Sequence, residues 1–584
     1  MKINSKIPLQ VLSLCFILIF HYSCSKDSDL LTDYVTSENM DTSDIGLLII
    51  DDTYFMSATS NVTLDVLAND TFENEEEVNI TETSSPSNGT VAINDNNTIT
   101  YTPDSEVIEQ VSDTTNNEVV EVVDTFTYTT EVVNEDETVS TETGNVTVTV
   151  TEDPDKTFMG QLKAFPGAEG FGKNATGGRG GIVYHVTNLN DDGPGSLRKG
   201  MEDVDGARTI VFDISGQINL ESRIYTFPLY SKGSSENRLT IAGETAPGSG
   251  ITIANYGITI RNGNVIMRHL RIRPGSNNGQ DSPDCISITP HNGDDASNII
   301  IDHCSLSWSQ DENIGIEGQS GNPVSNVTIQ NCIISESLNA YAVLVGRNVK
   351  NLSMLNNLFA NTGDRNPEHS YGDGSSFEFN NNIIYNYKRG VTIPYGIGKF
   401  DAINNKFKVK SAPATFNYYY ARNNVENPTG DADDGVIHQS GGITEGTPYG
   451  EMSTNWESWN QSSPTMSSLY SPTPASDLDA KLLGHIGANY TSNGMLFDDP
   501  VDKRILSNYE NSAGNFITNE SSVGGFPSLN SIKRPANYDT DGDGMADAWE
   551  LEQGLNPNDS GDGNDDRNGD GYTNLEEFLF SLVQ

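Results

Sequence analysis

The pattern of apolar and polar positions divides the chain into segments with different periods. From residue 49 to 155, β-branched and aromatic residues alternate with polar ones in short runs that end in Asn, Asp or Gly. Runs such as Val62–Val66 and Asn145–Val150 have the period of two that half-buried strands show. Strands of this length and spacing predict an antiparallel β-sandwich over residues 49–155.

A loose repeat replaces this pattern between residues 160 and 536. Polar triplets recur with middle positions 28, 26, 25 and 23 residues apart, at His303, Asn331, Asn357, Asn382 and Asn405. Each unit consists of a strand, a polar bend and a strand, and because one such pair cannot bury its own apolar face, the units must stack. We therefore predict an all-β fold whose main domain is a right-handed parallel β-helix. Its Asn column would be structural, because Asn tolerates the left-handed backbone that such a bend needs.

The first 24 residues read as an export signal. Two lysines precede an apolar run, Ile7–Phe20, that is too short to span a bilayer and fits a secretory leader. Ser23-Cys24 and the acidic stretch after it resemble the processing site and surface-export signal of Bacteroidetes lipoproteins. The resemblance implies a tether over residues 25–48 and an outer-membrane lipoprotein at the cell surface, which touches the membrane only through a lipid on Cys24. Plain secretion is the alternative.

The charge of the chain is concentrated at its two ends. The net charge is -49, of which residues 25–158 carry -29, residues 537–584 carry -12 and residues 159–536 only -10. Such a polyanion would be repelled by nucleic acid, so a nucleic-acid-binding protein is excluded. Three cysteines remain beyond the leader, an odd number from which no disulfide framework can be read.

Five motifs follow one another in the main domain. They are AFPGAEGFG from Ala164, TGGRGG from Thr176, NIIIDH from Asn298, VLVG from Val343 and NTGDRNP from Asn361. In this order they resemble polysaccharide lyase family 1, the pectate lyases, over roughly residues 160–440. The resemblance implies a parallel β-helix that binds pectate (polygalacturonate) and cleaves its 1,4-linked galacturonan by β-elimination. Unsaturated oligogalacturonides would be the products and Ca²⁺ the cofactor.

The resemblance implies that Arg365, two residues before Pro367, is the catalytic base. The proton that it would remove lies α to a carboxylate and is poorly acidic until that carboxylate is neutralised, which a calcium ion can do as a Lewis acid. Calcium would also explain how an acidic protein binds an acidic polymer. Because the pKa of an arginine is above about 12, nearby cations must favour its neutral form, and we expect an alkaline optimum.

The resemblance also implies a set of calcium ligands. Asp284 precedes a strand as a ligand of the family does, Asp311 and Glu312 follow about one coil later, and Asp281 adds a further carboxylate. Hard oxygen ligands that stacked coils bring together suit calcium. The sequence departs from the family at Ile300, where the family has Trp, so the ligand set is less firmly implied than the fold.

Further residues near the base are candidates for substrate contacts. Lys388 and Arg389 are candidate uronate-binding residues or solvated turn residues, and Tyr341 stands where the family has a substrate-contacting Lys. His369, beside the base, is a candidate proton donor. The pair Asp302-His303 matches a pair that is structural in the family, and we expect it to lie outside the site.

The acidic tail, residues 537–584, contains two copies of one loop pattern. Asp539–Glu550 and Asp566–Glu577 each place Asp, Asn or Glu at loop positions 1, 3, 5, 9 and 12 and Gly at position 6. This is the pattern of the EF-hand calcium loop, and the tail resembles dockerin-like and thrombospondin type 3-like modules. The predicted metal ligands are Asp539, Asp541, Asp543, Asp547 and Glu550 in the first loop, and Asp566, Asn568, Asp570, Asn574 and Glu577 in the second.

Our first hypothesis is therefore a monomeric, calcium-dependent pectate lyase. Residues 49–155 resemble the cadherin-like, immunoglobulin-fold modules of bacterial surface proteins, and we interpret them as an acidic spacer. One alternative is a lyase that acts on another uronate polysaccharide. Another is a non-catalytic surface protein that binds glycans. Arg365 with Pro367 favours the enzyme, because a binding protein has no need of them.

Overall fold

The structure is a computed structural model. It describes residues 49, 51–56, 62–64, 66–67, 70, 78–94, 97–111, 121–133, 139–151, 162–227, 237–276, 282–291, 296–319, 321–370, 375–395, 398–410, 417–421, 436–445, 460–466, 470–491, 494–568 and 570–583. The leader with Cys24, the tether and Asp281 lie outside these residues. Within them, no helix combines the length and the apolar character needed to cross a membrane.

The amino-terminal module is a β-sandwich. Its sheets have the strand orders β1-β7-β6-β3 and β2-β5-β4, and Tyr54, Tyr101 and Val148 belong to the buried core that joins the two sheets. The buried carboxylate of Asp124 accepts hydrogen bonds from the backbone N–H of Ser87 (2.8 Å) and from the Tyr101 hydroxyl (2.9 Å). Because both of its oxygens have partners within the module, Asp124 has a structural role. The elements are β1 Asp52–Met56, β2 Val62–Leu64, β3 Val78–Thr83, β4 Gly89–Ile93, β5 Ile99–Pro103, α3 Ser105–Val111, β6 Glu121–Val133 and β7 Val139–Thr151.

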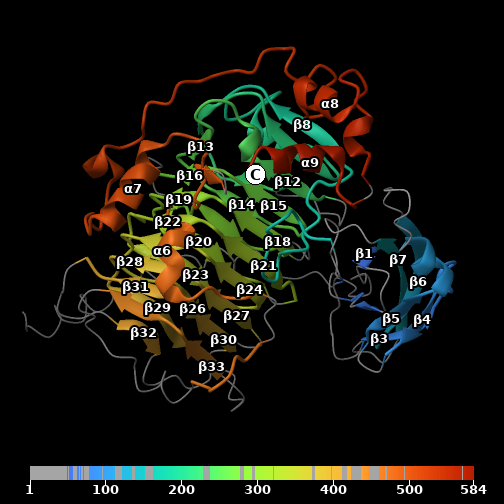
Figure 1. Ribbon diagram of the computed structural model, residues 1–584. Helices are drawn as coiled ribbons and strands as arrows, with labels where there is room; N and C mark the ends of the chain where they lie inside the picture. The colour runs from blue at the N-terminus through green and yellow to red at the C-terminus, as the bar shows by residue number, and fades with distance from the viewer. Residues whose placement is uncertain are drawn as a thin grey trace, which may run out of the picture. The chain divides into compact units, whose positions relative to one another are not determined.

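The main domain is a parallel β-helix of three sheets, each entered once per coil (Figure 1). One sheet has β8 Ile182–Val186, β9 Arg208–Phe212, β12 Leu239–Ala242, β15 Val265–Arg268, β18 Ala296–Asp302, β21 Val324–Gln330, β24 Val349–Leu355, β27 Ser376–Asn380, β30 Lys399–Ile403 and β33 Val436–Ser440. The second has β10 Gly216–Asn219, β13 Ile251–Ala254, β16 Arg271–Arg273, β19 Ser305–Ser307, β22 Ile333–Ser335, β25 Leu358–Ala360, β28 Ile383–Tyr385, β31 Lys406–Lys408 and β34 Ile443–Glu445. The third has β11 Ile224–Tyr225, β14 Ile258–Ile260, β17 Ile286–Ile288, β20 Glu312–Ile316, β23 Tyr341–Val345, β26 Glu368–Ser370, β29 Arg389–Tyr395 and β32 Asn417–Ala421.

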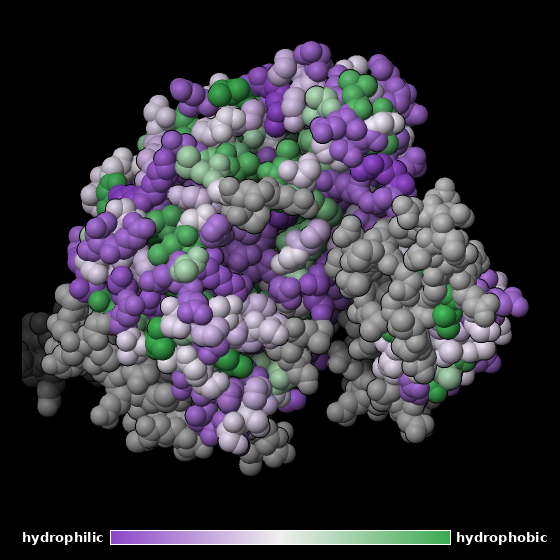
Figure 2. Space-filling model, in the orientation of Figure 1, coloured by the Kyte–Doolittle hydropathy of each residue, from purple (hydrophilic) through white to green (hydrophobic). Residues whose placement is uncertain are grey.

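The core of the β-helix consists of alternate residues of these strands. In β15, for example, Val265 and Met267 belong to the buried interior column, whereas Ile266 packs in a separate apolar cluster outside it. Because successive side chains of a strand point to opposite faces, one face of every strand fills the interior. The outer surface in Figure 2 is mainly polar, with apolar residues in small separate patches.

One bend of the coil carries the predicted left-handed column. Its residues have φ between 49° and 58°, and they are His303, Asn331, Asn356, Asn381 and Asn404. The triplets predicted this column at Asn357, Asn382 and Asn405, so the prediction was wrong by one residue at the last three positions. Either Asn of an Asn-Asn pair fits the sequence pattern.

The second residue of each Asn pair forms the ladder. The backbone N–H groups of Cys332, Asn357 and Asn382 donate to Oδ1 of Asn357, Asn382 and Asn405 at 2.9, 3.0 and 2.9 Å. These three Asn side chains are fully buried, and each also donates to a backbone carbonyl of the preceding coil. The column is thus structural, because every polar group that the bend buries finds a partner.

The helices lie outside the three sheets. Leu197 and Met201 of α4 are buried in the interior column, so α4 closes the first coil, as the end of a solenoid requires. In Figure 1, α7 lies beside β19 and β22, and α8 and α9 lie near β8 and β12. The remaining elements are α4 Leu197–Glu202, η3 Gly243–Thr245, η4 Ala475–Asp477, α6 Leu478–Leu482, β35 Tyr490–Thr491, β36 Gly494–Met495, α7 Pro500–Glu510, η5 Glu520–Val523, α8 Asp547–Gln553, η6 Asp562–Asn564 and α9 Asn574–Ser581.

A buried ion-pair network fastens α7 to the β-helix. Arg273 of β16 donates to both oxygens of Asp499 at 2.9 Å and to Asp502 at 2.8 Å. The side chains of Arg271 and Arg273 are fully buried, and Asp499 also caps α7 by accepting from the backbone N–H of Val501 and Asp502. The chain that follows the last coil therefore contributes a helix that is tied to the third coil of the β-helix.

Candidate active site

The predicted site residues lie side by side at the amino-terminal ends of successive strands of the eight-stranded sheet. Asp284 precedes β17, Glu312 begins β20, Tyr341 begins β23 and Arg365 precedes β26. The strands β17, β20 and β23 pair in parallel register, and Tyr341 forms a parallel bridge with Asp364. Because parallel register brings equivalent positions of successive coils side by side, residues far apart in the sequence form one row.

Three carboxylates of this row converge. Asp284, Asp311 and Glu312 each offer an oxygen, and these oxygens lie within 4.8 Å of one another. Ser287 donates to Asp284 Oδ2 at 2.7 Å, and Glu312 is 5% exposed. Hard carboxylate oxygens at this spacing, on rigid strands, fit a calcium ion.

Gly315 keeps space beside these carboxylates, a role that the sequence did not reveal. A Cβ atom at Gly315 would lie 2.7 Å from Asp284 Oδ2. Because Gly315 is on β20 and pairs with Ser287 on β17, a side chain there would push the Asp284 carboxylate away from its present position.

Substitution of Gly315 by Ala should therefore weaken calcium binding at this row by about 10–100-fold, the usual effect of disturbing a residue that orients a metal ligand. Titration of the folded variant with Ca²⁺ by calorimetry measures this. The far-ultraviolet circular dichroism should be unchanged, because the strand itself keeps its pairing. An unchanged calcium affinity would show that the ion does not depend on the position of Asp284.

Arg365 lies over the same row. Its guanidinium is 4.1 Å from the centre of the Tyr341 ring and forms an ion pair with Glu312 Oε1. Its Nε lies 3.8 Å from Glu368, and its side chain is 22% exposed. The backbone has φ 55°, and the N–H of Arg365 donates to Asp364 Oδ1 at 2.9 Å. The side chain is thus held between carboxylates with one side open to solvent.

Lys388 and Arg389 lie next to this arginine. Their backbone N–H groups both donate to the carbonyl of Gly363 at 2.9 Å. Arg389 pairs with Asp364 and has a side chain that is 55% exposed, and the Lys388 ammonium lies 5.0 Å from the centre of the Phe516 ring. Burial raises the pKa of Asp364, although the charge of Arg389 opposes this. Two cations therefore flank the row where an anionic chain could approach.

His369 does not face this row. It is fully buried in the strand next to Glu368, its Nε2 is 2.9 Å from Ser375 Oγ, and its ring packs against Phe377 and Phe400. Burial lowers its pKa to about 4. The idea that His369 donates the proton is therefore wrong, because alternate residues of β26 point inward and this one belongs to the core.

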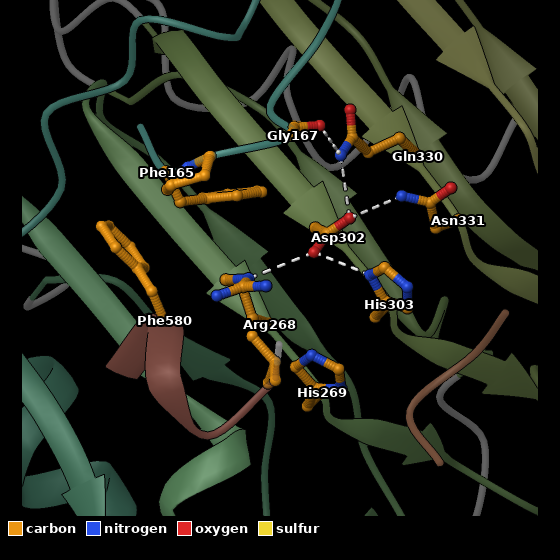
Figure 3. Close-up of a pocket in the computed structure, with 11 residues that line it drawn as sticks. Phe165, Gly167, Arg268, His269, Asp302, His303, Gln330, Asn331 and Phe580 are labelled. Atoms are coloured by element: carbon orange, nitrogen blue, oxygen red, sulfur yellow. Dashed lines mark hydrogen bonds and ion pairs between the residues drawn. The ribbon is translucent and has the colours of Figure 1, made fainter. Parts of the chain in front are cut away.

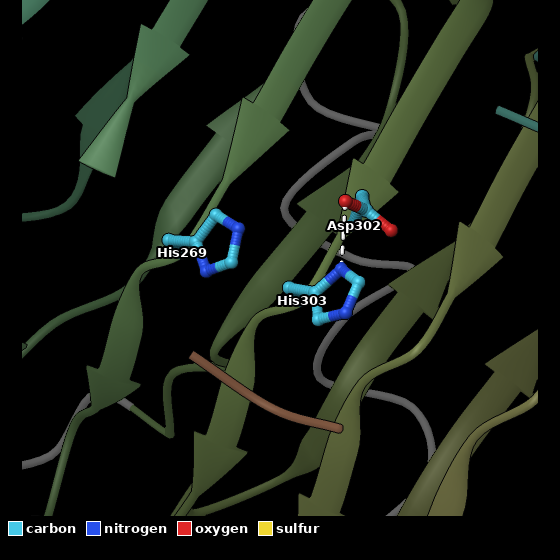
Figure 4. A group of neighbouring side chains, drawn as sticks. All are labelled: His269, Asp302 and His303. Carbon is cyan, nitrogen blue, oxygen red and sulfur yellow. Dashed lines mark hydrogen bonds and ion pairs between the residues drawn. The ribbon is translucent and has the colours of Figure 1, made fainter. Parts of the chain in front are cut away.

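A second polar cluster lies over the outer face of the ten-stranded sheet. It lines a pocket of about 200 Å³ (Figure 3). His269 and His303 stack with ring centres 5.0 Å apart, beside Asp302 (Figure 4). Both oxygens of Asp302 are taken, by His303 at 2.8 Å, Arg268 at 3.1 Å, and Gln330 and Asn331 at 2.9 Å.

This network is structural rather than a metal centre. Burial alone would raise the pKa of Asp302, but His303 and Arg268 hold it well below its usual range. A metal ion would have to displace the guanidinium of Arg268, which also pairs with Glu244 at 3.1 Å. The geometry thus favours the expectation that Asp302 and His303 stand outside the active site.

The predicted ligands of the tail separate into two arrangements. In the first loop, Asp539, Asp541 and Asp543 converge within 4.8 Å, and Asp547 instead accepts from the N–H and hydroxyl of Thr540. In the second loop, Asp566 accepts from the N–H groups of Asp570 and Gly571, Asn568 donates to Asp570, Glu577 pairs with Arg567 at 3.1 Å, and Asn574 donates to the carbonyl of Asp562.

Comparison with known proteins identifies both parts of the chain. Residues 48–149 match the bacterial Ig domain family. A probable pectate lyase C of Emericella nidulans is 33% identical over 442 residues, which cover 72% of this chain and 93% of the relative. A probable pectate lyase C of Aspergillus flavus is 35% identical over 441 residues, which cover 73% of this chain and 95% of that relative.

The chain belongs to the pectate lyase family. The lyase is thus an enzyme of the polysaccharide lyase class, and the alternative of a non-catalytic glycan-binding protein is set aside. Among solved structures, a pectate lyase studied for its anti-β-elimination mechanism has a TM-score of 0.39 and 14% identity over 56% of this chain and 98% of that one. The cedar pollen allergen jun a 1 has a TM-score of 0.40 and 19% identity over 54% and 90%.

Proposed function

We propose that the lyase cleaves 1,4-linked galacturonan by calcium-dependent β-elimination and releases unsaturated oligogalacturonides. One observation carries this proposal: the guanidinium of Arg365 lies in the same row as three convergent carboxylates, which are the two kinds of group that the reaction needs. The relatives are named pectate lyases, in agreement with this substrate.

The chemistry assigns a role to each part of the row. Calcium held by Asp284, Asp311 and Glu312 would neutralise the uronate carboxylate and stabilise the charge that develops on it. Arg365 takes the proton from C5, and the electron pair of the C5–H bond forms the C4–C5 double bond. The C4–O4 bond breaks at the same time, and the O4 group leaves and takes a proton from solvent.

Glu312 links the base to the ligand set. Its carboxylate pairs with Arg365 and also belongs to the convergent group, so it can serve only one cation fully. If Glu312 is engaged as a metal ligand, its ion pair with Arg365 would be weakened and the guanidinium would keep its contact with Glu368.

The flanking cations provide the contacts for a polymer. Arg389 and Lys388 are exposed on the side of Asp364, where a uronate carboxylate can form a charge-assisted hydrogen bond with a guanidinium. The Tyr341 ring packs against the guanidinium of Arg365. It would therefore position the base rather than contact the sugar.

Incubation of the lyase with polygalacturonate tests the proposal, with the unsaturated product followed by ultraviolet absorbance. We expect activity with Ca²⁺ and a loss of about 10²–10³-fold with a chelator, as when a main electrostatic stabiliser is removed. Activity on alginate but not on polygalacturonate would move the assignment to another uronate polymer. Equal activity with and without chelator would refute the calcium dependence.

We propose export by the signal in residues 1–24 and attachment through a lipid on Cys24, which would place the lyase where a polymer too large to enter the cell is available.

A further inference from the structure

The bend between the second and third sheets leads directly into the active-site row. Its left-handed residues include Glu336, Asn361 and Asn386, with φ of 49°, 57° and 49°. Asn361 comes four residues before Arg365, and Asn386 comes two residues before Lys388. A segment that packs on this bend therefore stands next to the row.

The helix α7 is fastened to this bend. Arg504 of α7 donates to both oxygens of Glu336, at 2.6 and 2.8 Å. Glu336 is buried, and its Oε2 also accepts from the indole N–H of Trp308 at 3.1 Å. With the ion pairs of Arg273 at the other end of the network, these bonds fix the place where the segment after α7 begins.

The backbone of that segment is held on both sides of Phe516. On one side, a Cβ atom at Gly514 would lie 2.7 Å from Asn361 Oδ1, so the segment touches the bend itself. On the other side, Ile517 belongs to one buried apolar cluster with Trp308. Phe516 lies between these two anchors, and its own side chain is only half-buried.

The ring of Phe516 meets Lys388. The Lys388 ammonium lies 5.0 Å from the centre of this ring, and a Cβ atom at Gly363, two residues before Arg365, would lie 3.7 Å from Lys388 Cδ. A lysine side chain loses much rotamer freedom when it is ordered, and the negative face of an aromatic ring attracts the ammonium and restricts it. The ring therefore keeps this cation close to the base.

The charge of Lys388 is available to a ligand. Its side chain is exposed, and none of the ion pairs among the described residues includes it, whereas its neighbour Arg389 pairs with Asp364. Phe516 is uncharged, so it holds the ammonium without neutralising it. An anion that approaches the row meets a cation whose position is already restricted.

The row has an acidic end and a basic end. Asp284, Asp311 and Glu312 lie at the strands β17 and β20, whereas Arg365 and Lys388 precede β26 and β29, which are neighbours in the same sheet. Because the coils stack along one axis, a polymer that lies along the row would place one unit at the carboxylates and another at Lys388.

We propose that Phe516 positions Lys388 to bind the carboxylate of a galacturonate unit beside the unit that reacts, so that the segment after α7 completes a substrate subsite. A uronate carboxylate forms a charge-assisted hydrogen bond with an ammonium group. The inference rests on the proposed function, since the occupant is the polymer that the enzyme cleaves. Phe516 is a positioning residue here, because it acts through the ammonium.

Kinetics on polygalacturonate at saturating Ca²⁺ test the subsite. We expect Lys388→Ala to raise KM by about tenfold with kcat nearly unchanged, because the lost contact is the same in the ground state and the transition state. Phe516→Leu should raise KM by about 3–10-fold, the range of a cation–π contact. Phe516→Tyr, which keeps the ring, should resemble the unmodified enzyme, as should the control Leu551→Ala at an exposed position of α8.

The double variant Lys388→Ala, Phe516→Leu distinguishes positioning from an independent contact. Its KM should equal that of Lys388→Ala within about twofold, because the ring has no ammonium left to position. Effects that multiply in the double variant would overturn the positioning role. An unchanged KM in Phe516→Leu, or a KM in Phe516→Tyr as high as that in Phe516→Leu, would overturn it as well.

Calorimetric titration with trigalacturonate measures the same subsite without turnover. The titration uses the full chain with Arg365→Ala and saturating Ca²⁺, and we expect Lys388→Ala and Phe516→Leu in this background to weaken binding by the factors given for KM. Weakened binding in both variants, with no cleavage by the unmodified enzyme, would refute the proposed reaction and support the subsite. Equal binding in the three proteins, or no binding by the background protein, would refute the subsite.

Discussion

Replacement of Arg365 by alanine should lower kcat on polygalacturonate by about 10²–10⁴-fold, the range in which a positioned general base contributes. The guanidinium lies over Tyr341 and against Glu312, and the described row has no second basic side chain in that position: Arg389 pairs with Asp364 at its flank. The initial rate of absorbance change at saturating substrate and Ca²⁺ measures the loss.

The calcium affinity of this variant distinguishes a base from a metal-site residue. Because Arg365 competes for Glu312, Arg365→Ala should bind Ca²⁺ at least as well as the unmodified enzyme while it loses activity. Added guanidinium should restore part of kcat, which a purely structural arginine would not show. Lys399→Ala, on an exposed position of the ten-stranded sheet, is the control and should keep full activity. Retained activity in Arg365→Ala would show that another group removes the proton.

The coil architecture could be predicted because it repeats. Each coil must turn through a left-handed residue and must satisfy the buried polar groups of that bend, so Asn recurs at a nearly constant spacing. The ladder through Asn357, Asn382 and Asn405 is the physical form of that signal. The register error of one residue arose because both residues of each Asn pair have a role, one for the backbone turn and the other for the ladder.

The row of the active site could be predicted in part for the same reason. Parallel register converts spacing along the chain into adjacency, so Asp284 and Glu312, about one coil apart, were expected to meet. The role of Gly315 was not visible, because a missing side chain has no pattern. Phe516 was not visible either, since its contact with Lys388 joins segments that are far apart in the sequence.

Buried ion pairs between residues far apart in the sequence could not be predicted. Arg271-Ile272-Arg273 reads as a strand with two solvated arginines, but both are fully buried against a helix more than 220 residues later in the chain. An alternating pattern says which residues share a face and not what covers that face. The covering segment was recognisable only as irregular chain, because its anchor is two aspartates, Asp499 and Asp502, at the start of a short helix.

Replacement of Arg273 by methionine should lower the stability of the β-helix by about 3–5 kcal/mol, the usual cost of removing one partner from a buried ion pair. The substitution leaves Asp499 and Asp502 in a site where they are fully or nearly fully buried. Among the residues that the structure describes, the other cation that pairs with either aspartate is Arg271, 3.7 Å from Asp499. The cap of α7 would be strained at the same time, because Asp499 anchors it. A calorimetric melt measures the fall in the transition temperature.

A double variant separates uncompensated charge from lost packing. Arg273→Met combined with Asp502→Asn removes one buried charge of each sign and leaves Asp499 paired with Arg271, so it should recover part of the stability. Lys503→Ala, which breaks an exposed pair with Asp498, should melt like the unmodified enzyme. If Arg273→Met alone melts like the unmodified enzyme, water must reach the aspartates, and the helix α7 is not sealed against the coil as the geometry indicates.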